Sequence, residues 1–361
     1  TVTAKGKNPE NNQVVFDCQC TNQNGKVVIE GEAEVIAPVD KIERPRVALP
    51  NVRLAERGRL REMFDAAEPL EPLPVAVVHP CSEYALRGAM EAAEANLILP
   101  MLIGPEDRIK ATAEEYELDI NGYSIIDVEH SHAAAEKSVE LARAGKAEAL
   151  MKGSLHTNEL MRAILHKERG IRSERRLSHV FAFDVPTYPR PLLVTDAAVN
   201  ISPTLEEMRD IVQNAIDLGH ALKIEKPKVA LLSAVETITK DIESTLTAAA
   251  LCKMAERGQI TGGLLDGPLA FDNAVSSYAT EVKGIVSQVA GQADILVAPD
   301  LEAANILAKQ LIYLADAQGA GILMGARIPI ILTSRADHVM ERMASCSLAI
   351  LYAHYRKTTL G

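Results

Sequence analysis

The chain has 361 residues, a formal net charge of −11, 47% hydrophobic residues and only 4% aromatic residues. This length favours two domains over a single hydrophobic core, and the aliphatic composition favours helices packed on parallel strands over a β-sandwich. The negative charge and the lack of a Lys/Arg-rich block argue against a nucleic-acid-binding protein. Because no apolar stretch reaches the roughly 18 residues of a membrane helix and no secretory signal opens the chain, we expect a cytoplasmic protein.

The cysteines are odd in number and show neither paired zinc-ligand spacing nor a CxxC redox pattern. We therefore expect reduced and mostly buried thiols and no metal site. These residues are Cys18, Cys20, Cys81, Cys252 and Cys346.

The first 46 residues differ in pattern from the rest of the chain. Strand-like segments at 13–21 and 26–36 flank residues 22–25, whose Asn-Gly pair favours a tight turn. The pattern predicts a β-hairpin, followed by a linker that Pro45 and Pro50 bracket. Since the chain does not start with Met, we expect it to begin inside a larger gene product.

From about residue 54, apolar strand patterns alternate with helical periods such as 83–95, 205–218 and 301–315. Repeated β–α units predict an α/β fold with mostly parallel strands and helices on both faces. In such sheets ligands bind at the carboxyl ends of the strands. The strands are expected at 73–78, 97–103, 123–128, 149–151, 192–195, 229–232, 264–265, 295–297, 322–324 and 328–333.

Three common enzyme signatures are missing: the GxxxxGK[ST] phosphate loop, the HExxH zinc helix and the GxSxG nucleophile elbow. Gly319, Gly321 and Gly325 come close to a dinucleotide-binding fingerprint, but their spacing is GxGxxxG and a strand, not a helix, is expected to follow. The sequence therefore disfavours a nicotinamide cofactor.

A buried-type strand runs directly into a helix at 328–341, with Ser334 and Arg335 at the junction and Asp337 and Glu341 on one helical face. A helix N-terminus can hold a phosphate oxygen, and an adjacent arginine can bind the same phosphate. The alternative is that Ser334 only caps the helix and Arg335 is solvated. Spacing alone leaves both interpretations open.

A second strand–turn–helix segment lies at 149–165. Thr157 is expected to cap the helix, and the hydroxyls of Ser154 and Thr157 lie near a helix start, where an anion could bind. Arg162 lies one and a half turns into this helix, and an exposed helical arginine is the alternative interpretation. We assign no role to His156.

Residues from about 55 to the end resemble the phosphate acetyltransferase and phosphate butyryltransferase family. The resemblance rests on six motifs in the family's order, and their combination makes it specific. The motifs are MKGSLHTNELMRAIL at 151–165, LLVTDAAVNISPT at 192–204, ALLSAVET at 230–237, DGPLAFDNA at 266–274, ADILVAPDLEAANILAKQL at 293–311 and GARIPIILTSRAD at 325–337.

The resemblance implies two α/β domains with the active site in a cleft between them, the second domain being inserted into the first. The first domain would comprise 47–165 and 325–361, and the second 166–324. It also implies a homodimer that uses coenzyme A as a substrate and needs no cofactor or metal.

The family's catalytic SR pair matches Ser334 and Arg335, and its substrate-binding arginine matches Arg162. The resemblance implies that the arginines bind phosphate and that the serine stabilises the oxyanion at the acyl carbon. A carboxylate then acts as the base for the thiol. Alignment with the acetyl branch places it at Glu341, whereas the SRAD form of the butyryl branch points to Asp337.

Residues 1–46 resemble the end of a hot-dog-fold enoyl-CoA hydratase, without that enzyme's catalytic segment. This resemblance implies the C-terminal part of a bifunctional enzyme. Two other functions stay open: a metal- and NAD-dependent 2-hydroxyacid dehydrogenase-like enzyme, and a CoA-binding module without catalysis. Acetyl transfer is favoured over butyryl transfer, although the sequence does not fix the acyl chain length.

Overall fold

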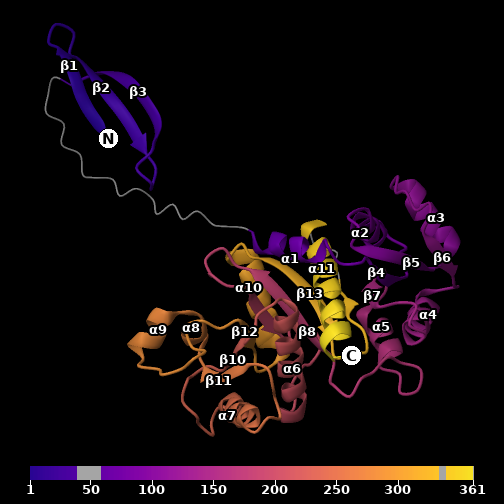
Figure 1. Cartoon of the computed structure of the whole chain (residues 1–361). Helices are drawn as coiled ribbons and strands as arrows, with labels where there is room; N and C mark the ends of the chain where they lie inside the picture. Colours follow the sequence, from indigo (N-terminus) through magenta and orange to yellow (C-terminus); the bar gives the residue numbers. More distant parts are fainter. Residues whose placement is uncertain (39–57, 333–338, 361) are drawn as a thin grey trace. The chain divides into compact units, whose positions relative to one another are not determined.

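A computed structural model describes residues 1–38, 58–332 and 339–360 (Figure 1). The chain forms two units, residues 1–54 and 55–361, and each is described by itself.

The first unit is a three-stranded antiparallel sheet in the order β1-β2-β3, made of β1 (Val2–Asn8), β2 (Gln13–Thr21) and β3 (Val27–Ile36). The predicted β2–β3 hairpin is confirmed, and Gly25 takes the positive φ of 75° that its turn requires. The sequence analysis missed β1, whose residues alternate poorly between apolar and polar. No described residue of this unit is buried, so the sheet lacks a hydrophobic core of its own.

The second unit is built on one sheet of eleven strands in the order β11-β10-β12-β9-β8-β13-β14-β7-β4-β5-β6. The predicted α/β class with mostly parallel strands is confirmed, because only the pairs β8–β9, β8–β13 and β13–β14 are antiparallel. The strands are β4 (Leu73–Val78), β5 (Ile98–Gly104), β6 (Ser124–Asp127), β7 (Ala149–Lys152), β8 (Ser178–Asp184), β9 (Leu192–Thr195), β10 (Lys228–Leu232), β11 (Leu264–Leu269), β12 (Ile295–Val297), β13 (Gln318–Met324) and β14 (Ile330–Ile331).

Helices cover both faces of this sheet (Figure 1). In β4, Val75 and Val77 pack into one core, with α1, α2, α6 and α11, while Ala76 and Val78 pack into another, with α4 and α5. A strand that is buried on both faces in this way has a continuous run of apolar residues in its sequence. The helices are α1 (Arg59–Ala67), α2 (Glu83–Glu94), α3 (Glu106–Glu115), α4 (Ser131–Arg143), α5 (Thr157–Ile164), α6 (Leu205–Ala221), α7 (Glu243–Glu256), α8 (Phe271–Val275), α9 (Ser277–Val282), α10 (Leu301–Leu314) and α11 (Val339–Tyr355), which a π-helical turn, η1 (Arg356–Leu360), follows.

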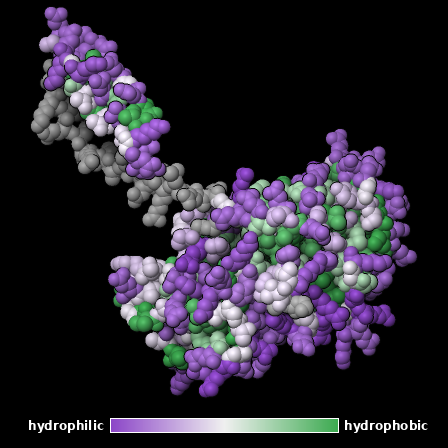
Figure 2. Space-filling model, in the orientation of Figure 1, coloured by the Kyte–Doolittle hydropathy of each residue, from purple (hydrophilic) through white to green (hydrophobic). Residues whose placement is uncertain are grey.

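In the described part of the chain, no helix is long and apolar enough to cross a membrane. The surface seen in Figure 2 is largely hydrophilic, with small hydrophobic patches.

The strands of the two predicted domains occupy the two ends of the eleven-stranded sheet. They meet where β13 pairs with β14, at the predicted boundary between residues 324 and 325. Residues from 55 onward form one unit, and the division into two domains stays a prediction.

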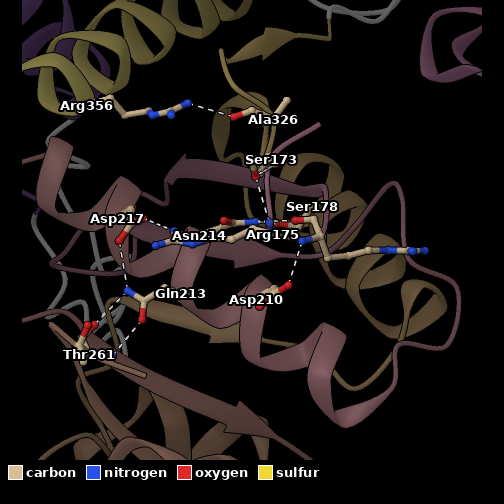
Figure 3. Close-up of polar contacts among 12 residues, drawn as sticks. Ser173, Arg175, Ser178, Asp210, Gln213, Asn214, Asp217, Thr261, Ala326 and Arg356 are labelled. Atoms are coloured by element: carbon tan, nitrogen blue, oxygen red, sulfur yellow. Dashed lines mark hydrogen bonds and ion pairs between the residues drawn. The ribbon is translucent and has the colours of Figure 1, made fainter. Parts of the chain in front are cut away.

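A polar network ties down the two chain segments that cross between these ends (Figure 3). Ser173 Oγ donates to Gly325 O at 2.6 Å, and Asn214 Nδ2 donates to Ser178 Oγ at 2.9 Å. Arg175 pairs with the buried carboxylate of Asp217. The network fixes the first residue of β8. Residues further along β8 line the cavity described below.

The prediction of mostly buried cysteines is wrong. Only Cys346, which belongs to α11, is buried in the core, and Cys20 is exposed on the three-stranded sheet. Cys18, Cys81 and Cys252 are half-buried. All five thiols are free.

Candidate active site

A cavity of about 380 Å³ opens at the carboxyl ends of β4, β7 and β9, where ligands of parallel sheets bind. The segments that follow these strands supply much of its lining, and β8, α10 and α11 supply the rest. The lining residues are Ser82, Tyr84, Ala85, Lys152, Gly153, Ser154, Leu155, Thr157, His179, Phe181, Ala197, Ala198, Asn305, Leu332 and Arg342.

One side of the cavity, which we call the charged wall, is formed by Ser82, Lys152, Gly153, Ser154 and Arg342. The two cations are the only formally charged side chains among the described lining residues, and no carboxylate lines the cavity there. On a chain with a net charge of −11, two cations on one cavity wall are a local concentration of positive charge.

The turn after β7 is held tightly against the end of β4. Gly153 N donates to Val78 O at 3.0 Å, and Ser154 N donates to His79 O at 2.9 Å. A Cβ on Gly153 would lie 2.4 Å from Val78 O, so only glycine fits this approach. The backbone geometry therefore fixes where Ser154 lies.

His79 and Ser82 complete this support. The imidazole Nδ1 of His79 lies 3.0 Å from Ser154 O, so Nδ1 carries the proton that it donates to this carbonyl. Burial lowers the pKa of His79, which favours the neutral ring. Ser154 Oγ donates to Ser82 Oγ at 2.7 Å, and the Ser82 hydroxyl caps no N–H of α2. The polar groups of the charged wall are thus largely satisfied before any ligand binds.

Arg342 reaches the cavity from the first turns of α11. Its side chain is buried, and its Nη2 donates to Glu91 Oε2 at 3.0 Å. A Cβ on Gly88 would lie 3.0 Å from Cδ and Nε of Arg342, so the glycine on α2 leaves room for the guanidinium. The ion pair with Glu91 fixes the position of the guanidinium group at the cavity.

The opposite side, which we call the apolar wall, is formed by His179, Phe181, Ala197 and Ala198. The carboxylate of Asp196 positions it by accepting hydrogen bonds from the backbone N–H groups of His179 at 3.1 Å and Ala198 at 3.0 Å. Burial raises the pKa of Asp196, although these hydrogen bonds act in the opposite direction. Asn305 Nδ2 donates to Ala197 O at 3.0 Å and fixes the same loop from α10.

The structure brings two predicted site residues, Ser154 and Thr157, into the cavity. The predicted N-cap at Thr157 is wrong, because α5 begins at this residue and His156 precedes it. Ser334, Arg335 and Asp337 lie outside the described residues. Glu341 is half-buried in the first turn of α11, directly before Arg342.

Arg162 lines a different cavity, of about 430 Å³, between α4 and α5. Arg143 and Arg169 line the same cavity, and none of these three guanidinium groups has an ion-pair partner among the described residues. The structure therefore does not bring Arg162 together with Ser154 and Thr157.

Six polar residues that line the cavity had no predicted role: Ser82, Tyr84, Lys152, His179, Asn305 and Arg342. Ser82 and Lys152 could have been found, because each stands at the carboxyl end of a predicted strand. His179 lies on a strand that was missed, and Asn305 and Arg342 lie within helices, where position in the sequence carries no signal for a site.

Across residues 1–38, 58–332 and 339–360, no group of three or more His, Cys, Asp or Glu side chains is arranged to hold a metal ion. The described lining offers cationic and hydroxyl donors rather than metal ligands.

The chain is similar in sequence to known proteins. The family described as "Phosphate acetyl/butaryl transferase" matches residues 134–350. A phosphate acetyltransferase from Rhizobium meliloti is 56% identical over 303 residues, which are 84% of this chain and 96% of that protein. A phosphate butyryltransferase from Clostridium acetobutylicum is 42% identical over 279 residues, which are 77% of this chain and 93% of that protein.

A solved structure shows the same arrangement of the chain. The branched-chain phosphotransacylase from Enterococcus faecalis V583 superimposes with a TM-score of 0.69 at 27% identity, covering 78% of this chain and 99% of that one. Sequence and structure agree, and this chain belongs to the phosphate acetyl/butyryl transferase family.

Proposed function

We propose that this acyltransferase moves an acetyl group between coenzyme A and inorganic phosphate, forming acetyl phosphate and free coenzyme A. The observation that carries the proposal is the charged wall, where Lys152 and Arg342 face a cavity whose described lining holds no carboxylate. Inorganic phosphate is an anion and coenzyme A carries phosphate groups, and paired cations with fixed hydroxyls bind such groups.

The acetyl group is preferred over butyryl because the Rhizobium meliloti relative, a phosphate acetyltransferase, is 56% identical, whereas the Clostridium acetobutylicum butyryltransferase is 42% identical. Phosphate butyryl transfer is the second candidate. Both reactions use the same site and differ only in the length of the acyl chain.

In the proposed mechanism the thiol of coenzyme A attacks the carbonyl carbon of acetyl phosphate, and inorganic phosphate leaves. A thiol with a pKa near or above about 8.5 is mostly protonated at neutral pH. A carboxylate base, Glu341 or Asp337, therefore takes the thiol proton as the carbon–sulfur bond forms. No covalent enzyme intermediate is required.

The charged wall holds the phosphate in this reaction. Lys152 and Arg342 offset its charge, and the fixed Ser154 hydroxyl helps to orient it. The family resemblance adds Arg335 as a further phosphate ligand and Ser334 as a donor to the oxyanion. Its assignment of Arg162 to substrate binding stays a prediction.

We further propose that the protein is a cytoplasmic homodimer, that coenzyme A enters only as a substrate, and that no metal or cofactor takes part. The first unit is proposed to be the end of a hydratase-like hot-dog domain, which would make the native product bifunctional. The family match at residues 134–350 does not extend to this unit.

Phosphate-dependent release of free thiol from acetyl-CoA and butyryl-CoA, measured side by side, tests the proposal. We expect release that requires phosphate and is faster with acetyl-CoA. Faster release from butyryl-CoA would favour the second candidate. Binding of coenzyme A without thiol release from either ester would contradict both.

A further inference from the structure

Among the described residues that line the cavity, one buried polar side chain makes no hydrogen bond with the protein. His179 lies on β8, is 3% exposed and belongs to the cavity lining. Its Nδ1 is fully buried without a hydrogen-bond partner, and no described residue bonds to Nε2. The large majority of buried side-chain polar atoms in proteins are hydrogen-bonded, so this ring requires an explanation.

Packing rather than hydrogen bonding holds the imidazole in place. Phe181 meets it edge-on, with ring centroids 4.4 Å apart. On the neighbouring strand β13, a Cβ at Gly321 would lie 2.7 Å from Cε1 and Nε2 of His179. The glycine therefore makes room for the ring, which gives a packing role to one of the glycines that resembled a dinucleotide fingerprint.

The backbone around the ring is fixed as well. His179 N donates to Asp196 Oδ1 at 3.1 Å, and His179 O accepts from Thr195 Oγ1 at 2.9 Å. The preceding residue, Ser178, is anchored through Asn214 in the network of Figure 3. The ring is thus preorganised at the cavity, although an unpaired buried polar group costs about 1–3 kcal/mol.

The other buried histidine at this end of the sheet shows that the chain can satisfy such a ring. His79 pairs its Nδ1 with Ser154 O, on the side of the charged wall. The two histidines therefore differ in their hydrogen bonding: His79 has a partner in the protein, whereas His179 has none among the described residues.

The environment of His179 selects the kind of ligand atom. Burial lowers the pKa of His179 to about 4, so the ring is neutral at physiological pH and offers a single N–H. A neutral donor among Phe181, Ala197 and Ala198 suits a carbonyl oxygen beside an apolar chain, whereas the phosphate charge is matched by Lys152 and Arg342.

We propose that His179 is a substrate-binding residue that donates a hydrogen bond to the acyl carbonyl oxygen, with Phe181 and the two alanines forming the surface on which the acyl chain lies. This inference rests on the proposed function and assigns the apolar wall to the acyl group. It also places a donor where negative charge develops when the thiol attacks the carbonyl carbon.

The test compares His179→Leu, which replaces the imidazole with an apolar side chain of similar size, with the wild-type protein. We expect kcat/KM for acetyl-CoA and for acetyl phosphate to fall by about tenfold to a hundredfold, the usual loss for one such donor. The Kd of free coenzyme A, measured by calorimetry, should not change, because coenzyme A without an acyl group lacks the carbonyl.

Two variants that retain an amide N–H identify the donor atom. His179→Asn places a nitrogen near the position of Nδ1, and His179→Gln places one near Nε2. We expect one of them to recover activity relative to His179→Leu. This comparison also keeps the inference testable if the leucine variant does not fold.

His220→Leu is the matched control, because this half-buried imidazole bonds to Ile224 O at 3.1 Å and does not line the cavity. It should lower the Tm and leave kcat/KM unchanged. An active wild-type protein with an unaffected His179→Leu variant would overturn the inference alone. So would equal weakening of coenzyme A and acetyl-CoA binding, or rescue by neither amide. An inactive wild-type protein would instead refute the proposed function.

Discussion

The two walls of the cavity differ in how their polar groups are satisfied. On the charged wall, the hydroxyl and the backbone of Ser154 have protein partners, and one of these partners is the ring of His79 outside the cavity lining. On the apolar wall, the backbone is equally well held, but the ring of His179 has no partner. This difference is the basis of our proposal that His179 keeps its hydrogen bond for the acyl group, although Nε of Arg342 on the charged wall is also buried without a hydrogen-bond partner.

The largest expected effect concerns the base that takes the proton of the thiol. Glu341→Gln and Asp337→Asn should be compared in the direction in which coenzyme A attacks acetyl phosphate. Only the true base should lose about a hundredfold to ten-thousandfold in rate. Near-normal rates in both folded variants would remove a carboxylate base from this helix.

The second prediction is a pH dependence of stability that originates on the apolar wall. The pKa of His179 is about 4 in the folded protein, against its ordinary value of 6.5. Between these pH values the unfolded chain binds more protons than the folded protein. The free energy of unfolding is therefore highest above pH 6.5 and decreases as the pH falls to about 4. The loss amounts to about 3 kcal/mol.

Urea unfolding of wild type and His179→Asn from pH 7 to pH 4 measures this contribution. The variant should lose the part of the pH dependence that His179 causes and show a shallower decline. Identical pH profiles would mean that the imidazole titrates normally and is not buried as described.

The third prediction concerns the tight turn after β7, which fixes the position of Ser154 in the charged wall. Gly153→Ala places a Cβ 2.4 Å from Val78 O, a backbone atom that cannot move freely. We expect a loss of about 1–3 kcal/mol in stability together with reduced turnover, because Ser154 is displaced. Gly31→Ala is the control, since a Cβ there meets nothing within 4 Å. An unchanged Tm for Gly153→Ala would contradict the tight turn.

The smallest effect concerns the hydroxyl pair of the charged wall. Ser82→Ala removes the acceptor of the Ser154 hydroxyl and should cost about 1 kcal/mol, with a higher KM for phosphate. Ser131→Ala removes a comparable hydroxyl that donates to Glu159 at 2.7 Å and does not line this cavity. A KM for phosphate that rises equally in both variants would argue against a role for the serine pair.

The sequence predicted the parallel part of the fold well, because apolar runs and helical periods are local signals. Helix α2 was expected at 83–95 and lies at Glu83–Glu94, and β4 and β9 were placed without error. Strand β8 was missed, since Ser178, His179 and Asp184 interrupt its apolar pattern. Strand β13 begins four residues earlier than expected, at Gln318, because its glycines have low strand propensity.

The same limits apply to the site. Ser154 and Thr157 were found from a strand–turn–helix pattern, which is local. His179 could not be found, because its importance depends on a missing partner, and that property exists only after β8, β13 and the loop at Asp196 come together. Arg342 likewise depends on the room that Gly88 leaves in another helix.

The most direct test of the account is a crystal structure of the protein with phosphate and coenzyme A, a pair that cannot react without an acyl group. The account predicts phosphate oxygens within hydrogen-bonding distance of Lys152 or Arg342, and the coenzyme A thiol in the same cavity, beside the apolar wall. Phosphate and thiol bound instead in the cavity of Arg143, Arg162 and Arg169 would contradict it.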